Sequence, residues 1–203
     1  MGSVKIITIG DSHSYSGWNK INIPGVVIIN KYLGPKLMYS FGKEKWIIIN
    51  DALRILEGDI VVFCFGEIDA RFHVHKYKEN GTENVIKSLV KNYFKAIELN
   101  VKNLSGVKIC IYFIPPALKE GEIGEDGRDP DYPYLGTDEE RRQYVSSFNE
   151  KLSYGCKNRG YIFIDLHSEY CDQNGFLRRD MSDEGPHIKD ISPLTKFILE
   201  RLI

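Results

Sequence analysis

The stretch VKIITIGDSHS, residues 4–14, joins a short run rich in Val and Ile to a polar turn that begins with glycine. Similar apolar runs follow at residues 26–29, 60–65, 109–114 and 161–164. Short, continuous apolar runs of this composition are typical of strands that are buried on both faces. The sequence therefore predicts about five buried strands, the first of which ends at the GDSHS turn.

Helical patterns lie between the predicted strands. Apolar residues recur every four positions over residues 85–101, and at steps of three and four over residues 145–156, after a start signal at Thr137. A last helix is predicted from Ser192 onward, with a proline in its first turn. Strands that alternate with helices predict a mostly parallel sheet covered on both faces, so we expect residues 1–203 to form a single three-layer α/β/α domain.

The composition argues against some classes of partner. Lys and Arg number 27 and Asp and Glu 28, so the net charge of -1 gives no general attraction to nucleic acid or to an anionic membrane. No apolar run approaches the roughly 18 residues that a transmembrane helix needs, and the N-terminus does not resemble a signal peptide. The 4 cysteines include no CxxC pair and are expected to be reduced thiols. We therefore expect a cytoplasmic protein with no nucleic-acid or membrane partner, and its oligomeric state stays open.

Polar residues follow the predicted strands at their carboxyl ends, where open parallel sheets bind ligands. Ser12 comes directly after the first strand, and its hydroxyl needs a base and an orienting group to act as a nucleophile. His187, in the last loop, has a carboxylate four residues before it and could complete such a triad. A simple glycine turn with an Asp or Ser cap would also explain the GDS sequence.

Two further features admit more than one interpretation. Asp11 and His13 have a DxH spacing, and His73 and His75 an HxH spacing, as in metal sites built from carboxylates and histidines. The chain lacks an Asn-His pair and a late GHxH, so we expect no metal and no cofactor, and we place His73 and His75 on an exposed extension. Segment 117–136, rich in Gly and acids, is predicted to be a loop that either covers a pocket or is an ordinary solvated excursion.

Four blocks, in the same order, resemble the SGNH (GDSL-type) hydrolase family. They are ITIGDSHS, FCFGEID, the helix RRQYVSSFNEKL followed by YIFIDLHSEYCDQNGFL, and SDEGPHIKD. The resemblance spans nearly the whole chain and implies a flavodoxin-like fold. It also implies Ser12 as the nucleophile, His187 as the base, and an oxyanion hole formed by the amides of Ser12 and Gly42. Gly42 fits the spacing of the second block better than Gly34 does.

The chain departs from the family pattern at two positions. The acid usually lies three residues before the histidine, where this chain has Glu184, but related sequences of the GEID type favour Asp183, four residues before it. Ile68 stands where the family has the Asn that donates to the oxyanion, and Ile cannot donate. Losing one such donor costs about 100- to 1000-fold in rate, unless Arg71 or His13 substitutes for it.

The resemblance implies a serine esterase that hydrolyses small O-acyl esters, with acetyl groups on a carbohydrate as the expected substrate. His13, Glu67, Asp69 and Arg71 are the candidate substrate-binding residues, although the three that follow the third strand could equally form a buried charge network. Acyl transfer to a sugar by the same serine is one alternative. A non-catalytic binding module for a glycan or other ligand is another, and Ile68 supports it.

Overall fold

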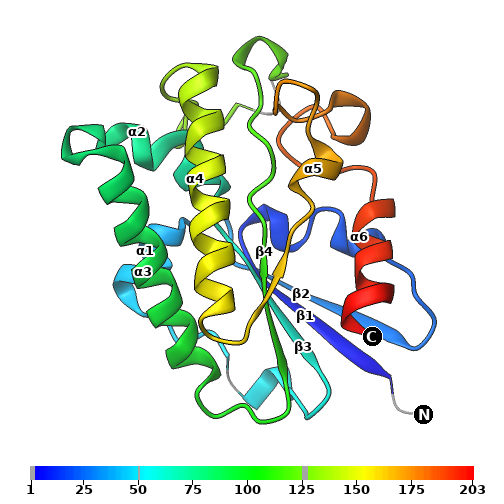
Figure 1. Ribbon diagram of the computed structural model, residues 1–203. Coiled ribbons are helices and arrows are strands. Elements are labelled where there is room, and N and C mark those ends of the chain that lie inside the picture. The colour runs from blue at the N-terminus through cyan, green and yellow to red at the C-terminus, as the bar shows by residue number, and fades with distance from the viewer. Residues whose placement is uncertain (1–2, 50, 125–127) are drawn as a thin grey trace.

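The computed structural model describes residues 3–49, 51–124 and 128–203. Five strands form one parallel sheet in the order β2-β1-β3-β4-β5 (Figure 1). The strands are β1 Val4–Gly10, β2 Val26–Tyr32, β3 Ile60–Cys64, β4 Lys108–Tyr112 and β5 Ile162–Ile164. Each predicted run forms a strand, which confirms the parallel five-stranded α/β sheet.

Helices cover both faces of this sheet (Figure 1). They are α1 Met38–Glu44, α2 Val74–Lys76, α3 Thr82–Val101, α4 Asp138–Lys157, α5 His167–Tyr170 and α6 Ser192–Phe197. The start of α4 follows the sequence signal, because the Thr137 hydroxyl accepts from the amide of Glu140 while the Glu140 carboxylate accepts from the amide of Thr137. The predicted start of the last helix at Ser192 is also confirmed.

Alternation along the strands explains why the apolar runs are continuous. Ile7 and Val61 pack into the core that lies under α1, α3 and α4. Ile6 and Val62 point the other way, into a second core with Leu194 of α6. Because successive strand residues face opposite sides, a sheet covered on both faces needs an apolar residue at nearly every position. The result is the three-layer sandwich that the pattern predicts.

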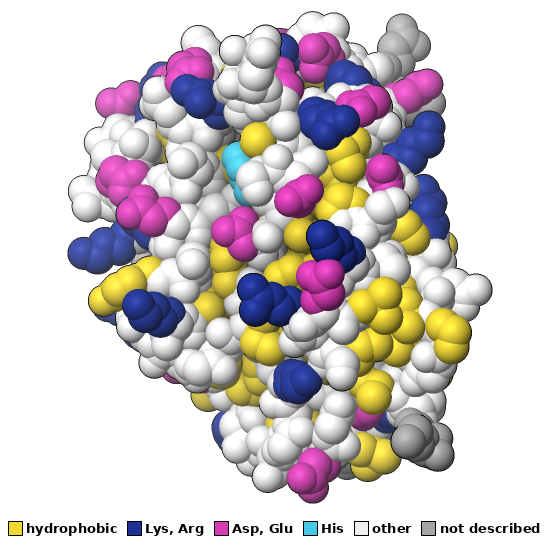
Figure 2. All heavy atoms as spheres, turned by 45° about the vertical axis from the view of Figure 1, so that its right-hand side comes forward, with side chains coloured by type: hydrophobic (Ala, Val, Ile, Leu, Met, Phe, Trp, Pro, Cys, Tyr) yellow, Lys and Arg dark blue, Asp and Glu magenta, His cyan; other side chains and the backbone are white. Residues whose placement is uncertain are grey.

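The outer surface agrees with the near-zero net charge. Figure 2 shows acidic and basic side chains interspersed over the face that carries α6, without a broad area of one sign. None of the helices in the described ranges combines the length and apolar character needed to cross a bilayer. All the cysteines are free thiols, of which Cys64, Cys110 and Cys156 are buried and Cys171 is partly exposed.

Candidate active site

The turn after β1 is shaped by one close approach and one cap. A Cβ at Gly10 would overlap the carbonyl oxygen of Cys64, so only glycine lets β1 end this close to β3. Asp11 then caps the 3-10 helix Ser12–Ser14, with its Oδ1 accepting from the amide of His13 at 2.9 Å. The Asp cap of the simple-turn interpretation therefore exists, and it sets Ser12 at the carboxyl end of β1.

Ser12, His187 and Asp183 form a continuous hydrogen-bonded chain. The Nε2 of His187 lies 2.9 Å from the Oγ of Ser12, and its Nδ1 lies 2.8 Å from Oδ2 of Asp183. The other carboxylate oxygen of Asp183 accepts from the amides of Gly185 and His187 at 2.7 and 3.2 Å. With Nδ1–H donated to the carboxylate, Nε2 of a neutral His187 is free to accept the serine proton.

The surroundings of Asp183 keep it ionised. Partial burial alone would raise its pKa, but the hydrogen bond and charge of His187, with the two loop amides, outweigh burial and lower the pKa. The carboxylate therefore stays negative at neutral pH, where it can fix the tautomer of the imidazole.

A cavity of about 440 Å³ opens on this chain of residues. Glu67 and Arg71 line it, as the strand-end pattern predicts, and the Nε of Arg71 lies 3.5 Å from Oε2 of Glu67. The guanidinium of Arg71 also lies over the ring of Tyr134, 4.7 Å from its centroid. Most of the remaining lining is polar and comprises Ser12, Tyr32, Pro35, Ile68, Arg128, Asp129, Asp183, Glu184, Gly185, Pro186 and His187.

Some of these cavity residues carry no motif in the sequence. Tyr32 and Pro35 stand at the end of β2 and just beyond it, so the strand-end rule applied to that run could have found them. Arg128 and Asp129 come from segment 117–136, whose length was the only signal. This segment reaches the cavity, as a pocket-covering loop would, although its residues 125–127 lie outside the described residues.

His13 lies beneath the cavity rather than in its lining. Its Nδ1 lies 3.1 Å from Oδ1 of Asp11, its Nε2 lies 3.3 Å from the carbonyl oxygen of Pro186, and its ring centroid is 5.1 Å from that of His187. Both nitrogens thus face acceptors, and only the imidazolium donates to both. The expected substrate contact of His13 is therefore corrected to a tether between the Ser12 turn and the His187 loop.

Replacing His13 by Gln is expected to lower kcat about tenfold with little change in KM, because the Gln amide cannot donate in both directions. Burial lowers the pKa of His13, but Asp11, Glu67 and the Pro186 carbonyl outweigh burial and raise the pKa. The ring of His187, which is also titratable, packs against the ring of His13. A raised pKa means that the tether stabilises the fold fully below about pH 6.5 and is lost as pH rises through the folded-state value. The gap in Tm between wild type and H13Q should accordingly shrink from pH 6 to pH 9, and a constant gap would contradict the tether.

Two other expected site residues serve the packing and capping of the helix α1 instead. Gly42 lies inside α1, where a Cβ would come within 3.0 Å of the backbone of α3, so its amide is not brought to the cavity. Asp69 is fully buried, and its carboxylate accepts from the amides of Met38 and Tyr39, at 2.6 and 3.1 Å, in the first turn of α1. Glycine serves close helix packing in the first case, and the carboxylate caps a helix in the second.

Burial raises the pKa of Asp69 to about 7. An acid with a raised pKa stabilises the fold below its unfolded value, near 4, and loses that contribution as pH rises toward 7. We therefore expect the free energy of unfolding of wild type to fall by up to about 4 kcal/mol between pH 4 and pH 7, measured against that of Asp69→Asn, whose side chain does not titrate. Urea unfolding of both proteins across this range measures the difference, and parallel curves would argue against the titration.

The DxH and HxH spacings of the sequence also allowed a metal site. Among residues 3–49, 51–124 and 128–203, no group of three or more His, Cys, Asp or Glu side chains is arranged to hold an ion. His73 is not on an exposed extension, as expected, but is buried between the rings of Tyr39 and Tyr77.

Comparisons with known proteins rest on structure, because no family model and no curated protein matches the sequence. A Streptococcus pneumonia protein assigned as a platelet activating factor aligns with TM-score 0.69 and 17% identity over 99% of this chain and 85% of its own. A catalytic mutant of an acetylxylan esterase from Geobacillus stearothermophilus aligns with TM-score 0.62 and 13% identity, over 100% and 95%. A GDSL-like lipase from Bacteroides thetaiotaomicron VPI-5482 aligns with TM-score 0.59 and 15% identity, over 98% of this chain and 87% of its own. Together with the parallel sheet and the turn after β1, these likenesses show that the chain has the α/β/α fold of the SGNH, or GDSL-type, hydrolases.

Proposed function

We propose that the protein is a serine esterase that hydrolyses small O-acyl esters. The observation that carries this proposal is the unbroken hydrogen-bonded chain from the Oγ of Ser12 through His187 to Asp183, opening on one cavity. In this arrangement the Ser12 hydroxyl has what it needs to become a nucleophile: His187 as a base within hydrogen-bond distance, and Asp183 to orient that base.

In the proposed reaction, the Oγ of Ser12 attacks the ester carbonyl while Nε2 of His187 takes its proton. The imidazolium then gives that proton to the leaving alcohol, and the acyl group stays on Ser12. Water attacks this acyl-enzyme with His187 again as base, which releases the acid and restores the hydroxyl. Throughout the reaction, the carboxylate of Asp183 accepts a hydrogen bond from the Nδ1–H of His187 and does not take the proton.

The backbone amide of Ser12 is the proposed donor to the oxyanion. It has no acceptor among the described residues, so it is free to bind a developing negative charge. Gly34 lies in the loop between Tyr32 and Pro35, which both line the cavity, and its amide replaces that of Gly42 in the proposal.

An acetyl ester of a carbohydrate remains the proposed substrate. The cavity offers Glu67, Arg71, Arg128 and Asp129, whose side chains supply both donors and acceptors for hydroxyl groups. Hydrolysis is favoured over acyl transfer to a sugar, because His187 and Asp183 retain 27% and 44% exposure of their side chains and water reaches both.

The direct test combines turnover with labelling. Wild-type protein should hydrolyse p-nitrophenyl acetate, and a fluorophosphonate should form one adduct, which peptide mass spectrometry assigns to Ser12. Labelling with turnover only after a sugar acceptor is added would identify a transferase. Absence of both turnover and label would identify a non-catalytic binding module and end the esterase proposal.

Ile68 gives a gain-of-function prediction. It is buried and lines the cavity, and it stands at the sequence position where the family resemblance implies the Asn donor. Ile68→Asn is expected to raise kcat for p-nitrophenyl acetate about 100-fold, because one oxyanion donor contributes at least that much. Ile68→Leu keeps an apolar side chain of equal size and should stay near wild type; a gain shared by both variants would contradict the oxyanion explanation.

A further inference from the structure

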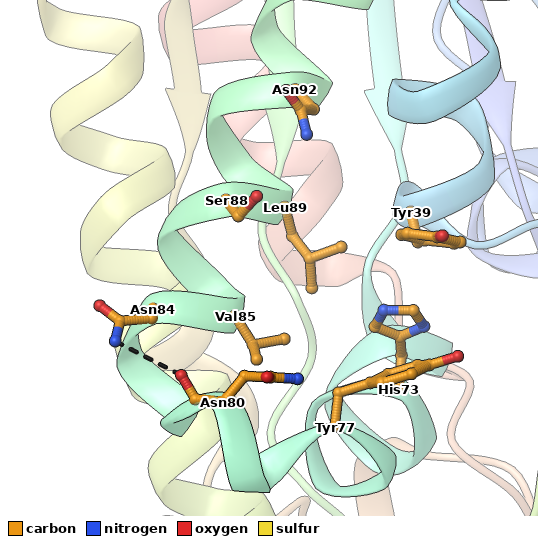
Figure 3. Close-up of a pocket in the computed structure, with 9 residues that line it drawn as sticks. All are labelled: Tyr39, His73, Tyr77, Asn80, Asn84, Val85, Ser88, Leu89 and Asn92. Atoms are coloured by element: carbon orange, nitrogen blue, oxygen red, sulfur yellow. Dashed lines mark hydrogen bonds between the residues drawn. The ribbon is translucent and has the colours of Figure 1, made fainter.

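A second cavity lies on the α3 side of the sheet and shares no lining residue with the catalytic cavity (Figure 3). Its volume is about 330 Å³, which is within the range of sites for small molecules. Tyr39 of α1, the π-helical turn Asp69–His73 and Tyr77 form one wall, and the first half of α3 forms the other.

The first wall consists of three aromatic rings in contact, each tilted against the next. The ring of His73 lies 4.3 Å from that of Tyr39 and 4.7 Å from that of Tyr77, centroid to centroid. Burial, with the charge of Lys76, lowers the pKa of His73 to about 4, so the imidazole is neutral at physiological pH. The three rings of the wall therefore present aromatic surface and phenol hydroxyls and carry no formal charge themselves.

The opposite wall is a row of neutral polar groups. Asn84, Ser88 and Asn92 follow one another at four-residue spacing along α3, so they share one face of the helix, with Val85 and Leu89 beside them (Figure 3). The side chains of Ser88, Asn92 and the nearby Asn80 have no hydrogen-bond partner within the part of the chain that the structure describes. Their amide and hydroxyl groups are both donors and acceptors that are free to bind a ligand.

These walls select the chemistry of a ligand. No lining residue carries a charge at neutral pH, so the lining itself offers phosphates and carboxylates no ion pair; Lys43, which donates to the Tyr39 hydroxyl at 3.1 Å, and Lys76 lie outside the lining. A ligand that matches both walls has an apolar ring face for the aromatic side and hydroxyls, which donate and accept, for the amide row. We propose that this cavity binds one neutral pyranose unit, with its ring face against Tyr39 and Tyr77 and its hydroxyls toward Asn80, Asn84, Ser88 and Asn92.

The position of the cavity connects it to the catalytic site. Arg71 and His73 belong to the same π-helical turn, and Arg71 lines the catalytic cavity whereas His73 lines the second one. Asp69, the first residue of this turn, accepts from the amide of Tyr39 at 3.1 Å. A saccharide bound at Tyr39 and Tyr77 would therefore contact two side chains that pack against His73, on the turn whose Arg71 lines the catalytic cavity. The proposal goes beyond ester hydrolysis and needs no chemistry at Ser12.

Binding should be measured on the Ser12→Ala protein, so that its outcome is independent of esterase activity. Saturation-transfer NMR with methyl glucopyranoside, methyl galactopyranoside and methyl mannopyranoside should reveal at least one ligand with about millimolar affinity. Titration should shift the side-chain amide signals of Asn80, Asn84 and Asn92, and glucose 6-phosphate and glucuronate should bind more weakly. Absence of binding by all three glycosides, or tighter binding of the charged sugars, would overturn the proposal.

Tyr77 locates the site. Its side chain is 41% exposed, so Tyr77→Ala should fold normally and weaken binding at least tenfold. Tyr77→Phe, which keeps the ring face, should retain most of the affinity. The matched control is Tyr154→Ala, since Tyr154 is an exposed tyrosine of α4 outside this cavity. Equal binding by Tyr77→Ala and the control would place the saccharide elsewhere and refute the assignment.

Discussion

Replacing Ser12 by Ala is expected to lower kcat for p-nitrophenyl acetate by about 10⁴- to 10⁶-fold, with little change in KM. Within the described residues, the Oγ of Ser12 has one side-chain hydrogen bond, to Nε2 of His187, so its removal deletes the proposed nucleophile and leaves the rest of the cavity in place. The fluorophosphonate adduct should disappear with the activity. Both readings come from the same purified protein, whose unchanged thermal unfolding would show that the fold is intact.

Ser16→Ala is the matched control for this variant. Ser16 lies four residues further along the same turn, its amide donates to the carbonyl of Ser12 at 2.8 Å, and its own side chain does not line the cavity. The variant should retain activity within about twofold, as surface substitutions commonly do. Hydrolysis that persists in Ser12→Ala, with a label that moves to another residue, would mean that the chain of hydrogen bonds at His187 is not the catalytic one.

The architecture was predictable because strands and helices leave local hydrophobic patterns in the sequence. Every strand appears as an apolar run, and the helices α3 and α4 appear in the spacing of their apolar residues. The predicted end of the second run at residue 29 was too early, since β2 continues to Tyr32 through polar residues. A strand at the edge of the sheet has one side open to solvent, so its end lacks the apolar signal.

The details of the site were less predictable because they depend on which residues, distant in the sequence, come close together in the folded chain. Ser12 and His187 are 175 residues apart, and only the rule for strand ends, with the family resemblance, brought them together. Spacing favoured Gly42 for the oxyanion hole, but a glycine is also needed where α1 packs on α3. Asp69 follows β3 as a substrate-binding carboxylate would, yet the helix α1 comes within hydrogen-bond distance and takes it as a cap.

The acid of the proposed triad is decided by a matched pair of variants. Asp183→Asn is expected to lower kcat about 10⁴-fold, because an amide at this position accepts or donates in the wrong sense and no longer fixes the Nδ1–H tautomer of His187. Glu184→Gln should change kcat by less than about tenfold. Asp183 provides the 2.8 Å contact to Nδ1, whereas no hydrogen bond joins the Glu184 carboxylate to the imidazole within the described ranges.

The usual spacing of the family would favour Glu184, whereas the spacing of related GEID-type sequences favours Asp183, which makes this comparison decisive. The carbonyl of Glu184 accepts from the amide of Gly124 at 3.3 Å, and a Cβ at Gly124 would lie 3.6 Å from its carboxylate, so the side chain faces segment 117–136. Asp183 instead has two loop amides that hold its carboxylate toward the imidazole. Rates for both variants, measured at pH 7 to 8 where the lowered pKa keeps Asp183 ionised, separate the two carboxylates. A larger loss in Glu184→Gln than in Asp183→Asn would assign the orienting role to Glu184 and require the last loop to rearrange during turnover.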